Sequence, residues 1–312
     1  MIIATHEDLL EYKAELETRT GEHIICKKIK DLTKEEKHRA EVIISYGNYD
    51  DELYEKELAE LPALKYVHIM SAGIETVPLA YLKGREVVLT NSHGVHAKPI
   101  SEYVIGMLLY HFKKIAVLTK AQSEQSWLSE VTASELEGKT IGILGTGSIG
   151  KEIAKKASIF QMTTLGMNSN GQAIEGFDQT YALKDRGELF RQSDIVCSVL
   201  PSTPKTIGIF NDTAFQQMKR GTVFMNVGRG DAVVESALAE ALDQSIIELA
   251  ILDVFDSEPL PRENPLWKHK KVIVTPHFSS KTDQYINRTL ALFYKNYMAF
   301  RNDQHQNLTN VI

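Results

Sequence analysis

The feature that most constrains the fold is a glycine-rich turn that joins a short apolar run to a helical pattern. Residues 140–150 read T-I-G-I-L-G-T-G-S-I-G, so G-x-G-x-x-G follows directly after a predicted strand. A strand, a glycine turn and a helix in this order are typical of a dinucleotide-binding βαβ unit. The glycines alone would equally fit a turn without a ligand, but this context predicts a phosphate-binding loop. The helical pattern is formed by Ile149, next to the last glycine, and by Ile153, Ala154 and Ala157.

Each glycine of this loop has an expected purpose. Gly145 permits the tight turn, Gly147 lets the backbone approach a pyrophosphate, and Gly150 lets the helix pack closely on the strand. The free N–H groups and the dipole of the helix N-terminus favour phosphate charge. We therefore expect cofactor contacts from Gly145, Thr146, Gly147, Ser148, Ile149 and Gly150.

The end of the next predicted strand indicates which dinucleotide is bound. An acidic residue normally takes the ribose hydroxyls of NAD at this position, but here the chain reads Asn168, Ser169 and Asn170. The missing carboxylate removes repulsion toward a 2′-phosphate, and these side chains can donate hydrogen bonds to it. The pattern favours NADP over NAD, and it leaves NAD open because no Arg or Lys follows to pair with the phosphate.

Strand and helix patterns alternate along most of the 312 residues, which predicts an α/β fold with parallel sheets. This length suggests two domains. A helix is expected at 7–17, one long helix from Pro99 to about Ala121, and a closing helix at 283–300. Strands are expected first at 23–27, 41–45, 66–70 and 87–90, and then, as six strands of a second sheet, at 140–144, 163–167, 195–200, 222–227, 249–254 and 272–275.

Composition excludes several classes of protein. A net charge of -6, from 35 basic and 41 acidic residues, provides no electrostatic surface for nucleic acid or an anionic membrane. The two cysteines, Cys26 and Cys197, are far apart, which argues against a disulfide framework. The chain has no apolar run of about 18 residues and no apolar N-terminal stretch, so we expect neither a membrane span nor a signal peptide. A cytoplasmic location is expected.

Polar groups follow three late strands, where ligands bind in open α/β sheets. Arg229 lies between glycines in N-V-G-R-G (226–230), and its guanidinium can hold a carboxylate or polarise a carbonyl. Glu258 follows in D-V-F-D-S-E-P (253–259), and His277 in V-T-P-H-F-S-S (274–280). Taken singly, each residue would more simply be a surface or loop side chain. The spacing of His93 and His96 resembles a metal pair, but no third ligand is near in the sequence, so no metal is expected.

Together the three groups suggest a ketone reduction. A hydride passes from a nicotinamide to carbon, and the carbonyl oxygen needs a proton donor that titrates near neutrality. His277 is the candidate donor, and Glu258 is the candidate partner that orients and charges the imidazole. Arg229 would hold and polarise a 2-oxo acid.

The chain resembles the D-isomer-specific 2-hydroxyacid dehydrogenase family over nearly its whole length. The matching segments are G-T-G-S-I-G (145–150), L-P-S-T-P-K-T (200–206), N-V-G-R-G (226–230), D-V-F with E-P (253–255 and 258–259) and T-P-H (275–277). The resemblance implies Arg229, Glu258 and His277 as a catalytic triad and backbone N–H groups of Ser71, Ala72 and Gly73 as the substrate-carboxylate site. It places further cofactor contacts at Leu200, Pro201, Thr206, Val227, Gly228 and Asp253.

The resemblance also implies the domain organisation. It indicates two Rossmann-like domains, a flavodoxin-like catalytic domain at 1–98 and 282–312 and a dinucleotide-binding domain at 99–281, with the active site in the cleft between them. A homodimer through the helix from Pro99 is expected. The apolar residues of that helix allow such an interface but equally fit an internal core: Val104, Ile105, Met107, Leu108 and Leu109.

These observations favour NAD(P)H-dependent reduction of a small 2-oxo acid, such as glyoxylate, hydroxypyruvate or a branched 2-ketoacid, to the D-2-hydroxy acid. The alternative is a dinucleotide-sensing binding protein or corepressor of the same fold with little turnover, because fold does not determine function. Formate dehydrogenase is disfavoured because that relative replaces the glutamate that here is Glu258. A phosphoglycerate dehydrogenase with a regulatory tail is disfavoured by the length of the chain.

Overall fold

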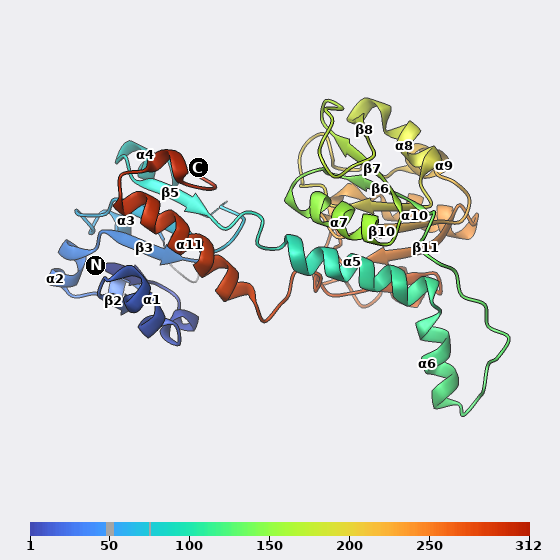
Figure 1. Ribbon diagram of the computed structural model, residues 1–312, viewed down its shortest axis with the longest axis horizontal. Helices are drawn as coiled ribbons and strands as arrows, with labels where there is room; N and C mark the ends of the chain where they lie inside the picture. The colour runs from blue at the N-terminus through green and yellow to red at the C-terminus, as the bar shows by residue number, and fades with distance from the viewer. Residues whose placement is uncertain (48–52, 75) are drawn as a thin grey trace. The chain divides into compact units, whose positions relative to one another are not determined.

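The computed structural model describes residues 1–47, 53–74 and 76–312, which form two compact units. The first unit comprises Met1–Val95 together with Thr282–Ile312, and the second comprises His96–Lys281. The sequence places the corresponding boundaries after residues 98 and 281. Each unit is an α/β structure built on one parallel sheet, which confirms the predicted fold class (Figure 1).

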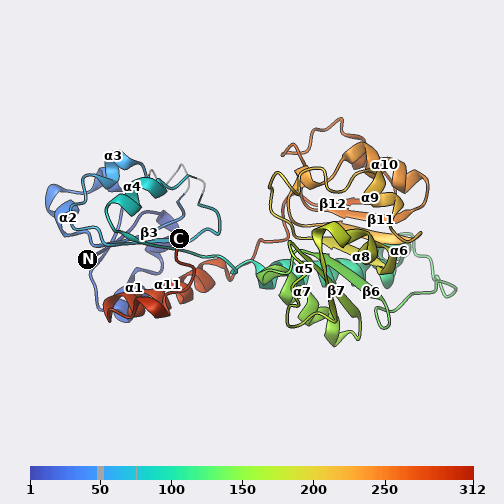
Figure 2. The same ribbon diagram turned by 90° about the horizontal axis from the view of Figure 1, so that it is seen from above.

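The first unit contains a five-stranded sheet in the order β2-β1-β3-β4-β5. Figure 2 shows helices on both faces of it, α1 and α11 on one side and α2, α3 and α4 on the other. The strands are β1 (Ile2–Ala4), β2 (Ile24–Cys26), β3 (Val42–Ser45), β4 (Tyr66–Ile69) and β5 (Val88–Asn91). The helices are α1 (Lys13–Thr20), α2 (Lys34–Arg39), α3 (Glu55–Leu58), α4 (Leu79–Gly84) and α11 (Tyr285–Arg301), with short 3-10 turns at Glu7–Leu10, Ile29–Asp31 and His305–Asn307.

Helix α11 returns from the end of the chain to cover this first sheet. Its apolar side chains Leu290, Phe293 and Tyr297 pack with strand residues such as Ile2 and Ile44 in one core cluster. The predicted closing helix at 283–300 is thus confirmed, with bounds shifted by two residues at its start and one at its end. The 31 residues after Lys281 therefore complete a core that begins at the N-terminus.

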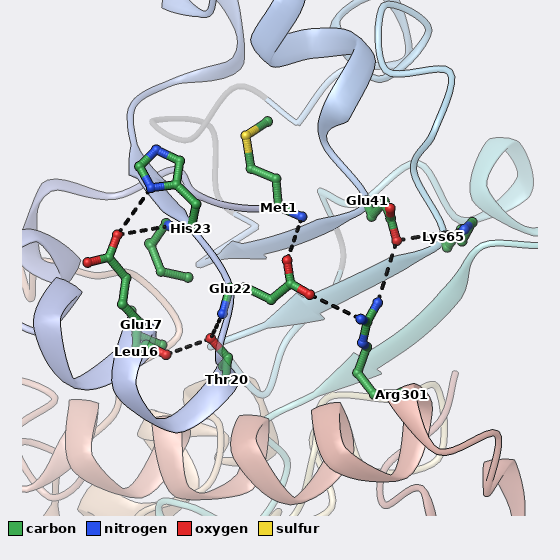
Figure 3. A network of polar contacts seen from close by, with 10 residues as sticks. Met1, Leu16, Glu17, Thr20, Glu22, His23, Glu41, Lys65 and Arg301 are labelled. Atoms are coloured by element: carbon green, nitrogen blue, oxygen red, sulfur yellow. Dashed lines mark hydrogen bonds and ion pairs between the residues drawn. The ribbon is translucent and has the colours of Figure 1, made fainter.

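Charged contacts attach the last turn of α11 to the opposite end of the chain. Arg301 pairs with Glu22 at 3.2 Å and with Glu41 at 3.8 Å, and Glu41 also pairs with Lys65 at 3.7 Å (Figure 3). The second oxygen of Glu22 accepts a hydrogen bond from the amino group of Met1 at 2.8 Å. Burial opposes ionisation of Glu22, but these cations and hydrogen bonds outweigh it and lower its pKa.

The second unit contains a seven-stranded sheet in the order β12-β11-β10-β9-β6-β7-β8. Helices α5 and α7 lie on one face and α8, α9 and α10 on the other (Figure 2). The strands are β6 (Thr140–Leu144), β7 (Thr163–Asn168), β8 (Gln179–Ala182), β9 (Ile195–Ser198), β10 (Thr222–Asn226), β11 (Ile247–Leu252) and β12 (Val272–Val274). The helices are α5 (Ala97–Phe112), α6 (Ile115–Ser123), α7 (Ser148–Ile159), α8 (Arg186–Gln192), α9 (Asp212–Gln216) and α10 (Glu235–Asp243), with 3-10 turns at Leu183–Asp185, Gly230–Ala232 and Pro265–Lys268.

The structure corrects several local predictions. The long helix expected from Pro99 to about Ala121 is two helices, because Lys114 adopts a left-handed φ of 57° that ends α5 and starts α6. The helix expected at 7–17 is a 3-10 turn at Glu7–Leu10 followed by α1, which begins at Lys13. Leu9 of the turn and Leu16 of α1 are buried in the same core cluster. The structure also contains two strands that the sequence did not predict, β1 and β8. β1 was too short to predict, with three residues, and β8 was too polar, because it reads Gln-Thr-Tyr-Ala at the edge of its sheet.

The apolar face of α5 belongs to the core of the second unit. Val104, Ile105 and Leu108 are buried against β6 and α7 residues, and Met107 and Leu109 pack at the margin of that cluster. Val104, Ile105 and Leu108 therefore do not offer a free surface, whereas Met107 and Leu109 are partly exposed. Across the described part of the chain, every helix is too short or too polar to cross a bilayer. Cys26 and Cys197 are both free thiols.

A buried histidine in β4 should make stability depend on pH. His68 is fully buried, its ring nitrogens lie 2.8 Å from Thr90 Oγ1 and 3.2 Å from Ser92 Oγ, and burial lowers its pKa to about 3. The unfolded chain protonates this histidine near pH 6.5, whereas the folded chain stays neutral, so acid favours unfolding. Between pH 7.5 and 5.0, His68 should remove about 2 kcal/mol from the free energy of unfolding.

Urea unfolding of wild type and His68→Gln at both pH values measures this contribution. The variant should lose less stability between the two pH values, by about the amount assigned to His68. Replacing the exposed His38 with Gln is the control and should leave the pH dependence unchanged. An equal pH dependence in His68→Gln and wild type would contradict the prediction.

Candidate active site

The glycine-rich loop joins β6 to α7 in the second unit. Gly145 has φ of +108°, which is the left-handed turn that glycine permits. A Cβ on Gly150 would lie 1.9 Å from the carbonyl oxygen of Gly145, so the helix can approach the loop only because this residue lacks a side chain. Gly147 is the N-cap of the 12-residue helix α7, is exposed, and has open space where a Cβ would be.

These features fit a bound pyrophosphate. The exposed backbone at Gly147 leads into the unpaired N–H groups of the first turn of α7, where a phosphate is stabilised by hydrogen bonds and by the helix dipole. Thr146 is buried and Ser148 and Ile149 are half-buried, so the rest of the predicted loop is held in the fold around that exposed point.

In the turn after β7, the side chain of one predicted cofactor residue, Asn168, forms hydrogen bonds within the turn. Asn168 Oδ1 accepts hydrogen bonds from the backbone of Asn170 at 3.2 Å and Gly171 at 2.6 Å, while its Nδ2 donates to the Gln172 carbonyl at 2.8 Å. Asn168 thus shapes the turn. Ser169 and Asn170 are exposed, and the Asn170 side chain accepts from the Gln172 backbone at 3.1 Å. Within the described part of the chain, the exposed Ser169 hydroxyl makes no hydrogen bond, so its predicted contact with the ribose stays a prediction.

The loop after β9 contains Leu200, Pro201 and Thr206. Thr206 is buried, and its hydroxyl donates to the Pro201 carbonyl at 2.6 Å and accepts from the Thr203 backbone at 2.8 Å. Its role in the structure is to close this loop. A Cβ on Gly228 would lie 2.6 Å from the Leu200 carbonyl oxygen, so the loops after β9 and β10 touch through a glycine.

Arg229 is an exposed residue between two buried glycines at the end of β10. A Cβ on Gly230 would lie 1.8 Å from the Phe255 carbonyl carbon, so the loop after β11 packs directly on this turn. The side chain of Asn226 stabilises the turn. It accepts a hydrogen bond from the Gly228 backbone N–H at 3.2 Å and donates one to the Arg229 carbonyl at 2.8 Å. The two glycines and Asn226 therefore determine the position of the backbone that carries the Arg229 side chain.

Glu258 and His277 are in contact beyond the ends of β11 and β12. Glu258 Oε2 lies 2.8 Å from His277 Nδ1, and Glu258 Oε1 accepts a hydrogen bond from the Phe255 backbone at 2.9 Å. Burial raises the pKa of Glu258, but the hydrogen bonds and the charges of His277 and Arg229 outweigh it, so the net pKa lies below its ordinary value. The structure thus brings Glu258 and His277 into contact and places Arg229 within electrostatic range of Glu258.

Asp253 holds the backbone on which His277 sits. This fully buried carboxyl group accepts hydrogen bonds from Thr275 Oγ1 at 2.5 Å and from the backbone of Phe278 at 2.8 Å and Ser279 at 2.9 Å. His277 itself has φ of +51°, a strained conformation for a residue with a side chain. The resemblance implies that Asp253 contacts the nicotinamide. In the structure, the oxygens of Asp253 accept hydrogen bonds from the turn at 275–279.

The predicted carboxylate-binding residues lie in the first unit, directly after β4. Ser71, Ala72 and Gly73 each accept a hydrogen bond at the carbonyl: from the Ser92 backbone at 3.1 Å, from Asn91 Nδ2 at 2.8 Å and from Ser71 Oγ at 2.6 Å, respectively. Tyr285 of α11 also donates to the Met70 carbonyl at 2.7 Å. These bonds orient the backbone of the turn.

Two residues that support the site were not predicted. Tyr103 of α5 and Thr275 are joined by a hydroxyl hydrogen bond of 2.7 Å, and Thr275 in turn donates to Asp253. Tyr103 carries no sequence signal beyond its position on a helix, because its partner lies 172 residues away. Among the residues that the structure describes, no group of three or more His, Cys, Asp or Glu is arranged to hold a metal ion.

Comparison with known proteins identifies the family. The family model described as D-isomer specific 2-hydroxyacid dehydrogenase, NAD binding domain, matches residues 105–279. The chain belongs to the D-isomer-specific 2-hydroxyacid dehydrogenase family. It is therefore an NAD(P)-dependent oxidoreductase of a family that acts on small 2-hydroxy and 2-oxo acids, as the sequence predicts.

Members of this family resemble the chain in sequence and in structure. Glyoxylate/hydroxypyruvate reductase B of Escherichia fergusonii is 30% identical over 281 residues, which are 85% of each chain. A family member from Aeromonas salmonicida is 30% identical, with a TM-score of 0.81 over 100% of this chain and 98% of that one. A Xanthobacter autotrophicus family member solved with NADPH and MES is 26% identical, with a TM-score of 0.77 over 100% and 97%.

Two glycines of the family fingerprint should respond differently to a methyl group. Gly150→Ala places Cβ against the backbone of Gly145, so we expect a loss of about 1–3 kcal/mol in the free energy of unfolding. Gly147→Ala has space and an ordinary φ of -75°, so stability should stay within about 0.5 kcal/mol of wild type. The methyl group would instead block the approach of a pyrophosphate and weaken dinucleotide binding at least about tenfold.

Denaturant unfolding and a fluorescence titration with NADPH measure the two effects separately. Gly106→Ala, at a position in α5 where an added Cβ would meet only open space, is the matched control for both. Equal stability of Gly150→Ala and Gly147→Ala, or normal dinucleotide affinity in Gly147→Ala, would contradict this assignment of the loop.

Proposed function

We propose that this protein reduces a small 2-oxo acid to the D-2-hydroxy acid, with His277 as the proton donor and Arg229 as the substrate-binding cation. The observation that carries the proposal is the 2.8 Å contact between His277 Nδ1 and Glu258 Oε2, made on a turn at the carboxyl ends of β11 and β12. A histidine oriented by a carboxylate is the arrangement that proton transfer to a carbonyl oxygen requires.

The geometry suggests how the chain moves the proton. Because Nδ1 faces Glu258, Nε2 is the atom that carries the proton to the substrate oxygen. Glu258 stays ionised because its pKa is lowered, and its negative charge stabilises the imidazolium before transfer. The nicotinamide dinucleotide, when bound, supplies the hydride for the carbonyl carbon. The proton from His277 then neutralises the oxygen that becomes the hydroxyl.

Arg229 and the turn after β4 are proposed to bind the substrate. The exposed guanidinium can form two parallel hydrogen bonds to a carboxylate or polarise the carbonyl. Backbone N–H groups of Ser71, Ala72 and Gly73 are proposed for the carboxylate. Relatives named glyoxylate/hydroxypyruvate reductase support glyoxylate and hydroxypyruvate as the first substrates to test.

NADPH is proposed as the preferred cofactor. The turn at 168–170 carries no carboxylate to repel a 2′-phosphate, and Ser169 presents an exposed hydroxyl there. The family member from Xanthobacter autotrophicus that was solved with NADPH is consistent with this choice. The cytoplasmic location and the homodimer remain predictions from the sequence and the family.

An assay with purified protein tests the proposed function. NADH and NADPH are supplied separately with glyoxylate, hydroxypyruvate and branched 2-oxo acids, and oxidation of the cofactor is followed. His277→Ala should lower kcat by about 10²- to 10⁴-fold, because proton donation contributes that much, while the Kd for NADPH stays near the wild-type value.

The same assay distinguishes the alternatives. If NADPH or NADH binds but no 2-oxo acid oxidises it, the protein is a dinucleotide-sensing binding protein. If His277→Ala keeps full turnover, His277 is not the donor. Lys281→Ala, which removes an exposed side chain four residues from His277, is the control and should keep turnover within a few fold of wild type.

The cofactor preference has its own test. Ser169→Asp places a carboxylate where NAD-binding chains carry one, so the ratio of the Kd for NADPH to that for NADH should rise at least about tenfold. Ser169→Asn keeps the size without the charge and is the matched control. An unchanged ratio in Ser169→Asp would show that the ribose contacts lie elsewhere.

A further inference from the structure

The turn after β4 contains three consecutive backbone N–H groups, those of Ser71, Ala72 and Gly73. Within the residues that the structure describes, none of these N–H groups donates a hydrogen bond. Ser71 and Ala72 are half-buried and Gly73 is exposed, so the turn is partly open to solvent. Successive backbone N–H groups can form a concave binding site for an anion. The quality of such a site depends on the direction in which each N–H points.

A side chain of α11 controls the direction of the first N–H group. The Tyr285 hydroxyl donates a hydrogen bond to the Met70 carbonyl at 2.7 Å. The peptide between Met70 and Ser71 is trans and planar, so its carbonyl and its N–H point in opposite directions, and fixing one fixes the other. Burial raises the pKa of Tyr285, so the hydroxyl keeps the proton that it donates. The Tyr285 ring is stacked on Tyr46, with ring centroids 6.1 Å apart and planes inclined by 8°.

The end of β5 controls the directions of the other two N–H groups in the same way. The Ser92 backbone donates to the Ser71 carbonyl at 3.1 Å, which fixes the N–H of Ala72. Asn91 Nδ2 donates to the Ala72 carbonyl at 2.8 Å, which fixes the N–H of Gly73. Each of the three N–H groups therefore has its own donor on the opposite side of the peptide. Two of these donors are side chains, which substitutions can remove one at a time.

Asn91 is itself held in place on several sides. Its side chain is 5% exposed, and its Oδ1 accepts a hydrogen bond from the His93 backbone at 3.2 Å. The Asn91 N–H donates to the Asn310 carbonyl at 3.2 Å. Asn310 Nδ2 donates in return to the carbonyls of Asn91 at 3.1 Å and His93 at 2.9 Å. The amide that donates to Ala72 therefore has one defined orientation.

We propose that Tyr285 and Asn91 are positioning residues for the substrate carboxylate: they hold the N–H groups of Ser71 and Gly73 in the directions in which an anion accepts from them. This inference rests on the proposed function, which assigns the carboxylate to this turn. Donors that are oriented before binding lose little freedom when the anion arrives, so their orientation increases affinity. A phenylalanine at position 285 would provide the same ring for packing, so the specific contribution of the tyrosine is its hydroxyl.

Steady-state kinetics with glyoxylate and NADPH measure the contribution of each side chain. Tyr285→Phe and Asn91→Ala should each raise KM for glyoxylate about three- to tenfold, which corresponds to the loss of one hydrogen bond. The carboxylate is bound equally in the ground state and in the transition state, so kcat should stay within about twofold of wild type. The Kd for NADPH should also stay within about twofold, because the phosphate loop lies in the other unit.

Each variant has a matched control on the same element. Tyr294→Phe removes the buried hydroxyl of another tyrosine of α11. Thr90→Val removes a buried hydroxyl from the residue before Asn91 in β5, where it lies 2.8 Å from Tyr66 Oη and from His68 Nδ1. Both controls should leave KM for glyoxylate near wild type. If a control raises KM as much as the variant that it matches, general loosening of that element explains the effect and the proposal is wrong.

Backbone amide NMR signals of the ligand-free protein test the positioning without substrate or cofactor. Tyr285→Phe should displace the Ser71 signal more than the Gly73 signal, because the Met70 carbonyl belongs to the same peptide as the Ser71 N–H. Asn91→Ala should displace the Gly73 signal more than the Ser71 signal. Signals that stay at their wild-type positions in both variants would overturn the proposal, as would displaced signals with an unchanged KM for glyoxylate.

Titration with oxamate separates this proposal from the proposed function. Oxamate has the carboxylate of a 2-oxo acid but is not reduced, and its Kd is read from the Gly73 amide signal. A chain that reduces no 2-oxo acid would refute the proposed function, whereas a Kd for oxamate raised about three- to tenfold in Tyr285→Phe would still support the positioning. An equal Kd in Tyr285→Phe and wild type would overturn it. If Asn91→Ala does not fold, Tyr285→Phe decides alone.

Discussion

The arrangement at the carboxyl ends of β11 and β12 depends on the buried carboxyl group of Asp253. A buried carboxyl group is costly unless its oxygens are hydrogen-bonded, and here three donors from one turn satisfy them. The His277 backbone also donates to the Asp253 carbonyl at 2.9 Å. Together these bonds hold His277 at a positive φ that a histidine would otherwise avoid. The direction of the imidazole toward Glu258 follows from that backbone.

Glycine determines how closely the other loops approach this turn. At Gly228 and Gly230 a single methyl group would overlap the backbone of another loop, and at Gly150 it would overlap the backbone of the phosphate loop itself. The Leu200 loop, the Arg229 turn and the Phe255 loop are therefore packed backbone against backbone. This packing leaves Arg229 exposed while its neighbours are buried.

Local sequence signals predicted most elements, and their failures have physical explanations. β6 was predicted at its observed bounds because an apolar strand and a glycine turn are both local features. The break between α5 and α6 was missed because Lys114 adopts φ of 57° without a glycine or proline to mark it. β8 was missed because an edge strand with a polar side lacks the apolar run of a central strand. The hydrogen bonds of Asn168 to the following turn were not anticipated because they are not apparent from residue type.

The sequence by itself determined the class of protein and the inventory of reactive groups. The glycine fingerprint and the residues after β10, β11 and β12 depend on short segments, so Arg229, Glu258 and His277 could be selected from spacing and residue type. Only the tertiary structure decided which groups touch. Glu258 meets His277 across 19 residues, Asp253 supports the turn 22 to 26 residues away, and Tyr103 reaches Thr275 across 172. Contacts between distant segments depend on sheet order and loop packing, which residue type and spacing do not encode.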